Sequence, residues 1–127
     1  MLCIAAAGVV TALSVPGFTL SWTHSVERTE WRERWRIKEH ELVLVEASVE
    51  GAGAGIDLPD DALWSDGHWT FRPRLKPLVS LSLAASGATT GGWTLCPLET
   101  DCLMLGAEAG EPVRIWADET CEGLAPQ

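Results

Sequence analysis

The chain has 127 residues, which suffices for one domain with a single core and is too short for two. Its 46% hydrophobic and 21% charged content is that of a folded protein, which excludes an intrinsically disordered chain. The net charge of −9 argues against a protein that binds nucleic acid or an anionic membrane surface.

The amino-terminal stretch contains no charged residue before residue 24. Residues 2–6 and 9–15 are predicted to form two strands that are joined near Gly8. The same apolar run could instead be the central part of a secretory signal, although no Lys or Arg precedes it. Pro16 interrupts the run, which leaves it too short for a membrane-spanning helix.

The next stretch has the clearest periodicity in the chain. Apolar and polar residues alternate over residues 18–26, and they alternate again with reversed parity over residues 31–37. This pattern predicts two long strands with a turn or a bulge between them at residues 27–29. The second segment could instead be helical, because Trp31 and Trp35 are four residues apart. The uninterrupted two-residue rhythm favours the strand.

The rest of the chain shows short apolar runs between Gly and Pro turns. The clearest predicted strands are residues 42–49, 68–72, 93–96 and 113–116. About eight short strands and no convincing helix predict an all-β fold, either an antiparallel β-sandwich or a partly open barrel. We expect a single domain over residues 1–127, in which residues 118–127 form a frayed tail.

The four cysteines are too few and too scattered to make a disulfide scaffold. Cys96 and Cys102 flank a short loop that a disulfide could close, and Cys3 with Cys121 is the remaining pair. In an oxidising compartment we expect a Cys96–Cys102 disulfide and, with less support, a Cys3–Cys121 disulfide. In a reducing compartment all four would be small core thiols.

The sharpest local candidate for chemistry is His24 with Glu27 and Glu33. The alternation assigns His24 and Glu33 to the interior, where each needs a partner. If the two strands form a hairpin, the imidazole and the carboxylate come within cross-strand reach. The favoured interpretation is a His–Glu pair that fixes the strand register, and the alternatives are a ligand or metal site and acid–base catalysis.

Two further features invite a functional interpretation. Residues 51–55 alternate Gly and Ala but lack the Lys and Ser/Thr of a phosphate-binding loop, so a bulge or a chain crossing is favoured. A cationic row alternates along residues 28–38 with one Glu interrupting it. This row could meet an anionic partner, but we favour the interpretation that it protects an edge strand from unwanted pairing.

Three sequence segments carry a resemblance to a known family. They read FTLSWTHSVERTEW, LVLVEASVEGAGAG and PDDA, and WTLC follows at residues 93–96. The chain resembles bacterial proteins that contain domain of unknown function 1850, and the likeness extends over nearly its whole length. That family is similar to companions of tripartite, ATP-independent periplasmic (TRAP-type) solute transporters.

The resemblance implies a location outside the cytoplasm and a TRAP-type transporter component as partner. A cytoplasmic location is the alternative, since the sequence contains no clear signal peptide. The residues show no catalytic triad, metal motif or nucleotide loop, so we expect a non-enzymatic accessory module without a cofactor. The expected ligand-binding surface consists of His24, Glu27, Glu33, Gly53, Gly55 and Trp69, near Trp64. The second hypothesis is a domain that binds a small ligand or a metal through His24, Glu27 and Glu33.

Overall fold

The computed structural model describes residues 1–23, 29–51, 58–85 and 92–122, and within these ranges the chain forms eleven strands and no helix. The strands are β1 (Leu2–Ala6), β2 (Val9–Leu13), β3 (Gly17–Thr23), β4 (Glu30–Lys38), β5 (Glu41–Glu50), β6 (Leu63–Ser65), β7 (His68–Phe71), β8 (Ser80–Leu83), β9 (Trp93–Pro97), β10 (Leu103–Leu105) and β11 (Val113–Ala117).

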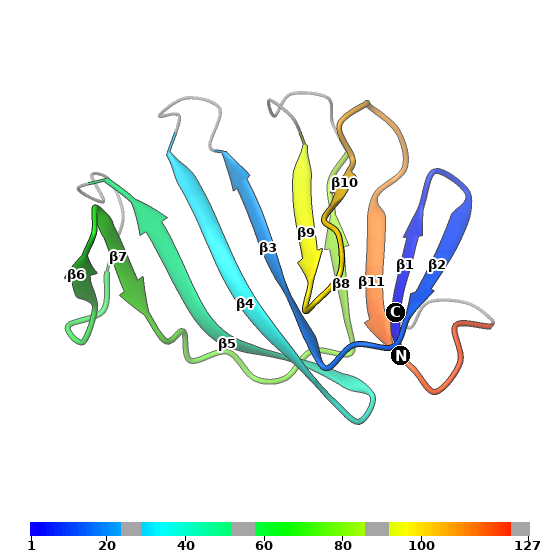
Figure 1. The fold of residues 1–127 in the computed structure, drawn as a ribbon, viewed down its shortest axis with the longest axis horizontal. Helices are drawn as coiled ribbons and strands as arrows, with labels where there is room; N and C mark the ends of the chain where they lie inside the picture. The colour runs from blue at the N-terminus through cyan, green and yellow to red at the C-terminus, as the bar shows by residue number, and fades with distance from the viewer. Residues whose placement is uncertain (24–28, 52–57, 86–91, 123–127) are drawn as a thin grey trace.

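These strands form two antiparallel sheets (Figure 1). The four-stranded sheet has the order β2-β1-β11-β8, and the seven-stranded sheet has the order β10-β9-β3-β4-β5-β7-β6. The predicted all-β, antiparallel, sandwich-like fold is confirmed. The barrel alternative is not, because the sheets do not close on themselves.

The amino-terminal residues are strands of the folded domain. β1 pairs with β2 on one side and with β11 on the other, and Leu2, Cys3 and Ile4 are at most 1% exposed. The predicted strand pair is confirmed, with β2 ending at Leu13 rather than at residue 15. Within the described ranges, the chain contains no helix of the length and apolarity that crossing a bilayer requires.

The strand interpretation of residues 29–38 is also confirmed, and the helical alternative is wrong. Along β4, Trp35 is buried at 3% exposure, whereas Arg32, Arg34 and Arg36 are exposed. β3 pairs antiparallel with β4, with Leu20 opposite Glu33. The turn predicted at residues 27–29 lies mostly outside the described residues.

The position of β4 corrects one interpretation of the cationic row. β4 is hydrogen-bonded to β3 on one side and to β5 on the other, so it is a central strand and not an edge strand. Its cationic side chains therefore do not protect an exposed backbone edge. The row has to be explained by the face of the sheet that it occupies.

The core lies where the two sheets face each other. It contains Leu2, Ile4, Leu83, Val113, Ile115 and Ala117 from the four-stranded sheet and Phe18, Leu20, Trp35, Leu42, Leu95 and Leu105 from the seven-stranded sheet. We call the core-facing side of the seven-stranded sheet its inner face and the opposite side its outer face. No described residue of β6 or β7 belongs to the core cluster, and these strands lie at the end of the molecule opposite β1 and β2 (Figure 1).

Two disulfides are present among the described residues. Cys96 at the end of β9 is bonded to Cys102, which precedes β10, and Cys3 in β1 is bonded to Cys121 beyond β11. Both pairings are those expected for an oxidising compartment. The first closes the β9–β10 hairpin loop, and the second ties the two ends of the described chain together beside the backbone hydrogen bond from Asp118 N–H to Met1 O.

Candidate functional site

A row of tryptophans crosses the inner face of the seven-stranded sheet. Residues that lie opposite each other in neighbouring strands point to the same face of a sheet. The register places Trp22 opposite Trp31, Trp31 opposite Val49, Val49 opposite Trp69, and Trp69 opposite Trp64. The ring of Trp93 in β9 contacts Trp22 at 4.9 Å between centroids. We call Trp93, Trp22, Trp31, Trp69 and Trp64 the tryptophan row.

The rings of the row form two groups. Trp22 stacks on Trp31 with 6.2 Å between centroids and 4° between planes, and Trp93 extends this group toward the core. Trp64 and Trp69 form the second group at 5.4 Å. Trp22 and Trp93 pack against the core cluster, whereas Trp31, Trp64 and Trp69 lie outside it. The row therefore leads from the core to an end of the sheet that the four-stranded sheet does not cover.

Glu33 lies one position further along the inner face of β4. Its neighbours across the strands are Leu20 and Ala47, both buried, and its Oε1 accepts a hydrogen bond of 3.1 Å from the indole N–H of Trp35. Burial raises the pKa of Glu33 above its ordinary value of 4.5, and the hydrogen bond from Trp35 opposes that rise. Glu33 is thus a half-buried carboxyl group among apolar and indole side chains.

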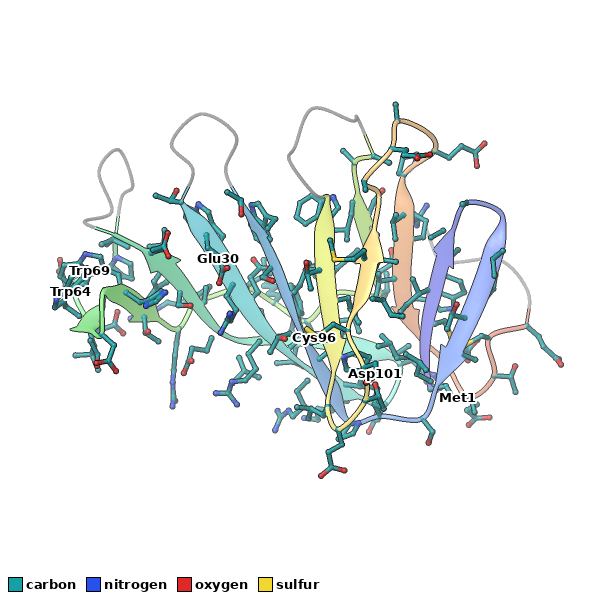
Figure 2. All side chains as sticks on the ribbon, turned by 45° about the horizontal axis from the view of Figure 1, so that its top comes forward. Met1, Glu30, Trp64, Trp69, Cys96 and Asp101 are labelled. Carbon is teal, nitrogen blue, oxygen red and sulfur yellow. A yellow bond between two sulfur atoms is a disulfide. The ribbon has the colours of Figure 1, made fainter. Side chains whose placement is uncertain are left out.

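Strand β6, at the outer end of the row, carries two exposed apolar side chains. Trp64 is 52% exposed and Leu63 is 71% exposed, and both belong to β6, which pairs with β7 alone. The indole N–H of Trp69 is buried and has no hydrogen-bond partner among the described residues. Figure 2 shows Trp64 and Trp69 side by side at this end of the molecule. Trp64 and Trp69 lie on the inner face, whereas Leu63 points to the outer face of the same edge. We call Leu63, Trp64 and Trp69 the β6 edge surface.

The structure describes only part of the predicted site. His24, Glu27, Gly53 and Gly55 lie outside the described residues, and so does the predicted His24–Glu33 pair. Glu33 and Trp69 occupy the same inner face with β5 between their strands. Within the described part of the chain, no group of three or more His, Cys, Asp or Glu side chains could hold a metal ion.

Two features of this surface were missed in the sequence. β6 has three residues and follows a turn-rich segment, so its alternation is too short to detect. The tryptophan row depends on the register of six paired strands. Its members are far apart in the chain, so the sequence alone does not show that they are neighbours. The only available signal was the high tryptophan content, seven residues with no tyrosine.

The comparisons with known proteins give one match. The family described as a domain of unknown function (DUF1850) matches residues 18–105. This range covers nearly all of β3 and every other strand of the seven-stranded sheet, together with β8, and it leaves out β1, β2 and β11. No curated protein and no solved structure matches the chain.

Proposed function

Because this chain belongs to the DUF1850 family, we propose that it is a non-enzymatic interaction module that works with a TRAP-type solute transport system outside the cytoplasm. In this proposal the β6 edge surface contacts a protein component of the transporter. The link to transport comes from the family resemblance. The contact surface is argued from the described side chains.

The exposed pair Trp64 and Leu63 carries the proposal. Both side chains are more than half exposed on an edge strand away from the shared core. Trp64 shares the inner face with Trp69, and Leu63, the preceding residue of the strand, points to the outer face. A large apolar side chain left in water at an uncovered sheet edge is typical of a protein interface, and tryptophan is the residue most enriched among interface hot spots. Trp69 supports Trp64 from the neighbouring strand through the ring contact.

The disulfides support the proposed location. All four cysteines are paired, as Cys3–Cys121 and Cys96–Cys102. Disulfides persist in oxidising compartments such as the bacterial periplasm and are rare in the reducing cytoplasm. Two disulfides in one small domain are therefore consistent with a protein that works outside the cytoplasm.

The proposal is tested by binding between purified proteins. The domain is titrated with the solute-binding and membrane components of a TRAP-type transporter from the same organism, and the dissociation constant is measured by interferometry. Trp64→Ala is expected to weaken binding by at least about tenfold, since truncating a tryptophan hot spot costs about 2 kcal/mol or more. Met104→Ala is the matched control, because Met104 is 61% exposed on β10 at the opposite edge of the same sheet.

Binding of neither component would contradict the transport proposal. Equal effects of Trp64→Ala and Met104→Ala would contradict the assignment of the β6 edge surface. Trp64→Ala must also keep the melting temperature of the parent domain, so that a loss of affinity reports a lost contact.

A second candidate function is favoured by Glu33. A carboxyl group that is half-buried among indoles and has a raised pKa is a common feature of ligand sites. In this alternative His24, Glu27 and Glu33 bind a small ligand or a metal. Elemental analysis of protein purified without an affinity tag tests the metal form. About one equivalent of metal that disappears in Glu33→Gln would support this alternative, and no metal in either protein would contradict it.

A further inference from the structure

The outer face of the seven-stranded sheet contains a groove of about 420 Å³. Its described lining residues are Pro16, Gly17, Arg34, Trp35, Arg36, Val43, Val45 and Leu98. The register explains why these residues meet: Arg36 lies opposite Gly17 on one side and opposite Val43 on the other. The groove therefore crosses the sheet from the β9–β10 loop to β5.

The floor of the groove is main chain because Gly17 has no side chain. A Cβ atom at Gly17 would lie 2.5 Å from the carbonyl oxygen of Trp35, so the close approach of β3 to β4 requires glycine here. Gly17 O accepts a hydrogen bond from Leu98 N–H at 3.1 Å, which fixes the loop beside the floor. The Cys96–Cys102 disulfide closes that loop, so one wall of the groove is anchored at both ends.

The opposite wall is apolar because of a β-bulge in β5. The register of β5 against β4 shifts between Arg34 and Trp35, where Glu46 faces Arg34 and Leu44 faces Trp35. Val45 is the extra residue, and it joins Val43 in lining the groove. With Leu98 across the floor, the groove has three aliphatic side chains on two sides.

The charged side chains that line the groove are both positive. Arg34 and Arg36 are two residues apart in β4, so they lie on the same face about 7 Å from each other. Arg34 has an ion pair of 3.5 Å with Glu46, but both side chains are well exposed, at 51% and 36%, so this pair is weak. Arg36 makes no ion pair with any other described residue, and no carboxylate is among the described residues that line the groove.

We propose that this groove binds a small organic carboxylate. The guanidinium groups of Arg36 and Arg34 receive the carboxylate, for which the planar fork of arginine is suited. The aliphatic body of the ligand lies over the Gly17 floor between Leu98 and the two valines. A protein with a net charge of −9 repels anions over most of its surface, so two arginines beside an apolar groove mark the place where an anion is accepted.

The groove also explains the cationic row better than edge protection does. A central strand needs no charge to block pairing, whereas an anion site needs cations held in fixed positions by regular backbone. The groove volume is within the range of small-molecule sites, about 300–1,000 Å³. The proposed ligand site does not depend on the proposed contact with a transporter, because the groove lies over β3, β4 and β5 and contains no residue of the β6 edge surface.

The test is a titration followed by amide NMR signals, with hexanoate, acetate and hexylammonium as probes. Hexanoate is expected to shift the signals of Gly17, Arg36 and Val43 saturably and to bind at least about tenfold more tightly than acetate, because its chain buries several methylene groups. Hexylammonium, which has the same chain and the opposite charge, is expected to cause no saturable shift. No saturable shift with hexanoate, or equal affinity for the ammonium, overturns the proposal.

Variants then assign the residues. Arg36→Gln is expected to weaken hexanoate binding at least about tenfold, since a charge-assisted hydrogen bond to the carboxylate is lost. Arg32→Gln is the matched control, because Arg32 lies on the same face of β4 but does not line the groove. Arg36→Lys is expected to recover part of the affinity. Equal losses in Arg36→Gln and Arg32→Gln would show only a general charge effect and would overturn the site.

Two further variants separate this site from the proposed function. Val45→Thr keeps the side-chain shape and exchanges one methyl group for a hydroxyl group, so hexanoate is expected to bind several-fold more weakly while acetate is unaffected. Trp64→Ala is expected to leave hexanoate binding unchanged. A loss of hexanoate binding in Trp64→Ala would place the ligand at the β6 edge surface and would overturn the groove assignment.

Discussion

Glu33 is the described residue whose chemistry depends most on its surroundings. Because burial raises its pKa above 4.5, the folded protein binds the carboxyl proton more tightly than the unfolded chain does. Glu33 therefore contributes most to stability when it is protonated. That contribution is lost as the pH rises from the unfolded pKa through the folded pKa.

We expect Glu33→Gln to remove this pH dependence. Gln keeps the side-chain shape and an oxygen that can accept the Trp35 indole N–H, but it has no charge to desolvate. The free energy of unfolding of the parent, relative to the variant, should therefore fall as the pH rises from below 4.5 through the raised pKa of Glu33. Urea unfolding across this range measures it, with Glu50→Gln as an exposed control at the end of β5. If the free energies of unfolding of the parent and of Glu33→Gln changed equally with pH, the burial assigned to Glu33 would be contradicted.

Gly17 tests the close approach of β3 and β4. Gly17→Ala is expected to lower the free energy of unfolding by about 1–3 kcal/mol, because the new Cβ atom would meet the Trp35 carbonyl oxygen at 2.5 Å and the backbone must move. Gly110→Ala is the matched control, since a Cβ atom there meets nothing within 4 Å. Its effect should stay within about 0.5 kcal/mol. Equal effects in the two variants would show that β3 and β4 are not in this contact.

At the scale of elements, the two disulfides are expected to contribute differently to stability. In the chain-entropy model the effect of a disulfide grows with the loop that it closes. Cys3–Cys121 spans 118 residues and Cys96–Cys102 spans 6. Replacing the first pair with Ser should cost about 5 kcal/mol and the second about 2 kcal/mol, as measured by urea unfolding. The reverse order would mean that the short disulfide stabilises chiefly through the folded hairpin.

The strands that could be predicted from the sequence are those long enough to show alternation. β3 and β4, and the side chains of each that point inward, could be predicted because apolar and polar residues alternate along both segments. β6 was missed because three residues carry no usable rhythm. The central position of β4 could not be predicted either, because alternation reports which side chains share a face and not which strand is the neighbour.

The candidate site shows the same limit. Glu33 could be placed on the inner face from parity alone, but its hydrogen bond comes from Trp35, on the same strand, and its cross-strand neighbour is Leu20. The tryptophan row and the groove over Gly17 depend on the register across several strands. Register is set by turns, bulges and the packing of whole sheets, so it could not be read from one segment at a time.

At the scale of the whole molecule, the structure divides into a packed core and an uncovered sheet end. Ile115 is fully buried in the core cluster, whereas Trp64 is 52% exposed outside it. Ile115→Ala is expected to lower the free energy of unfolding by about 2–5 kcal/mol. Trp64→Ala should cost far less, because most of its surface is already in water. Chemical denaturation of both variants measures this difference, and a larger loss for Trp64→Ala would mean that the β6 edge surface is structural.

The most direct test of the proposed interaction module is hydrogen–deuterium exchange of the domain with and without the TRAP-type component that binds it. We expect the backbone amides of Leu63–Ser65 and His68–Phe71 to gain protection in the complex, because the partner would cover β6 and β7. Protection confined to β1, β2 or β10, with β6 and β7 unchanged, would contradict the account.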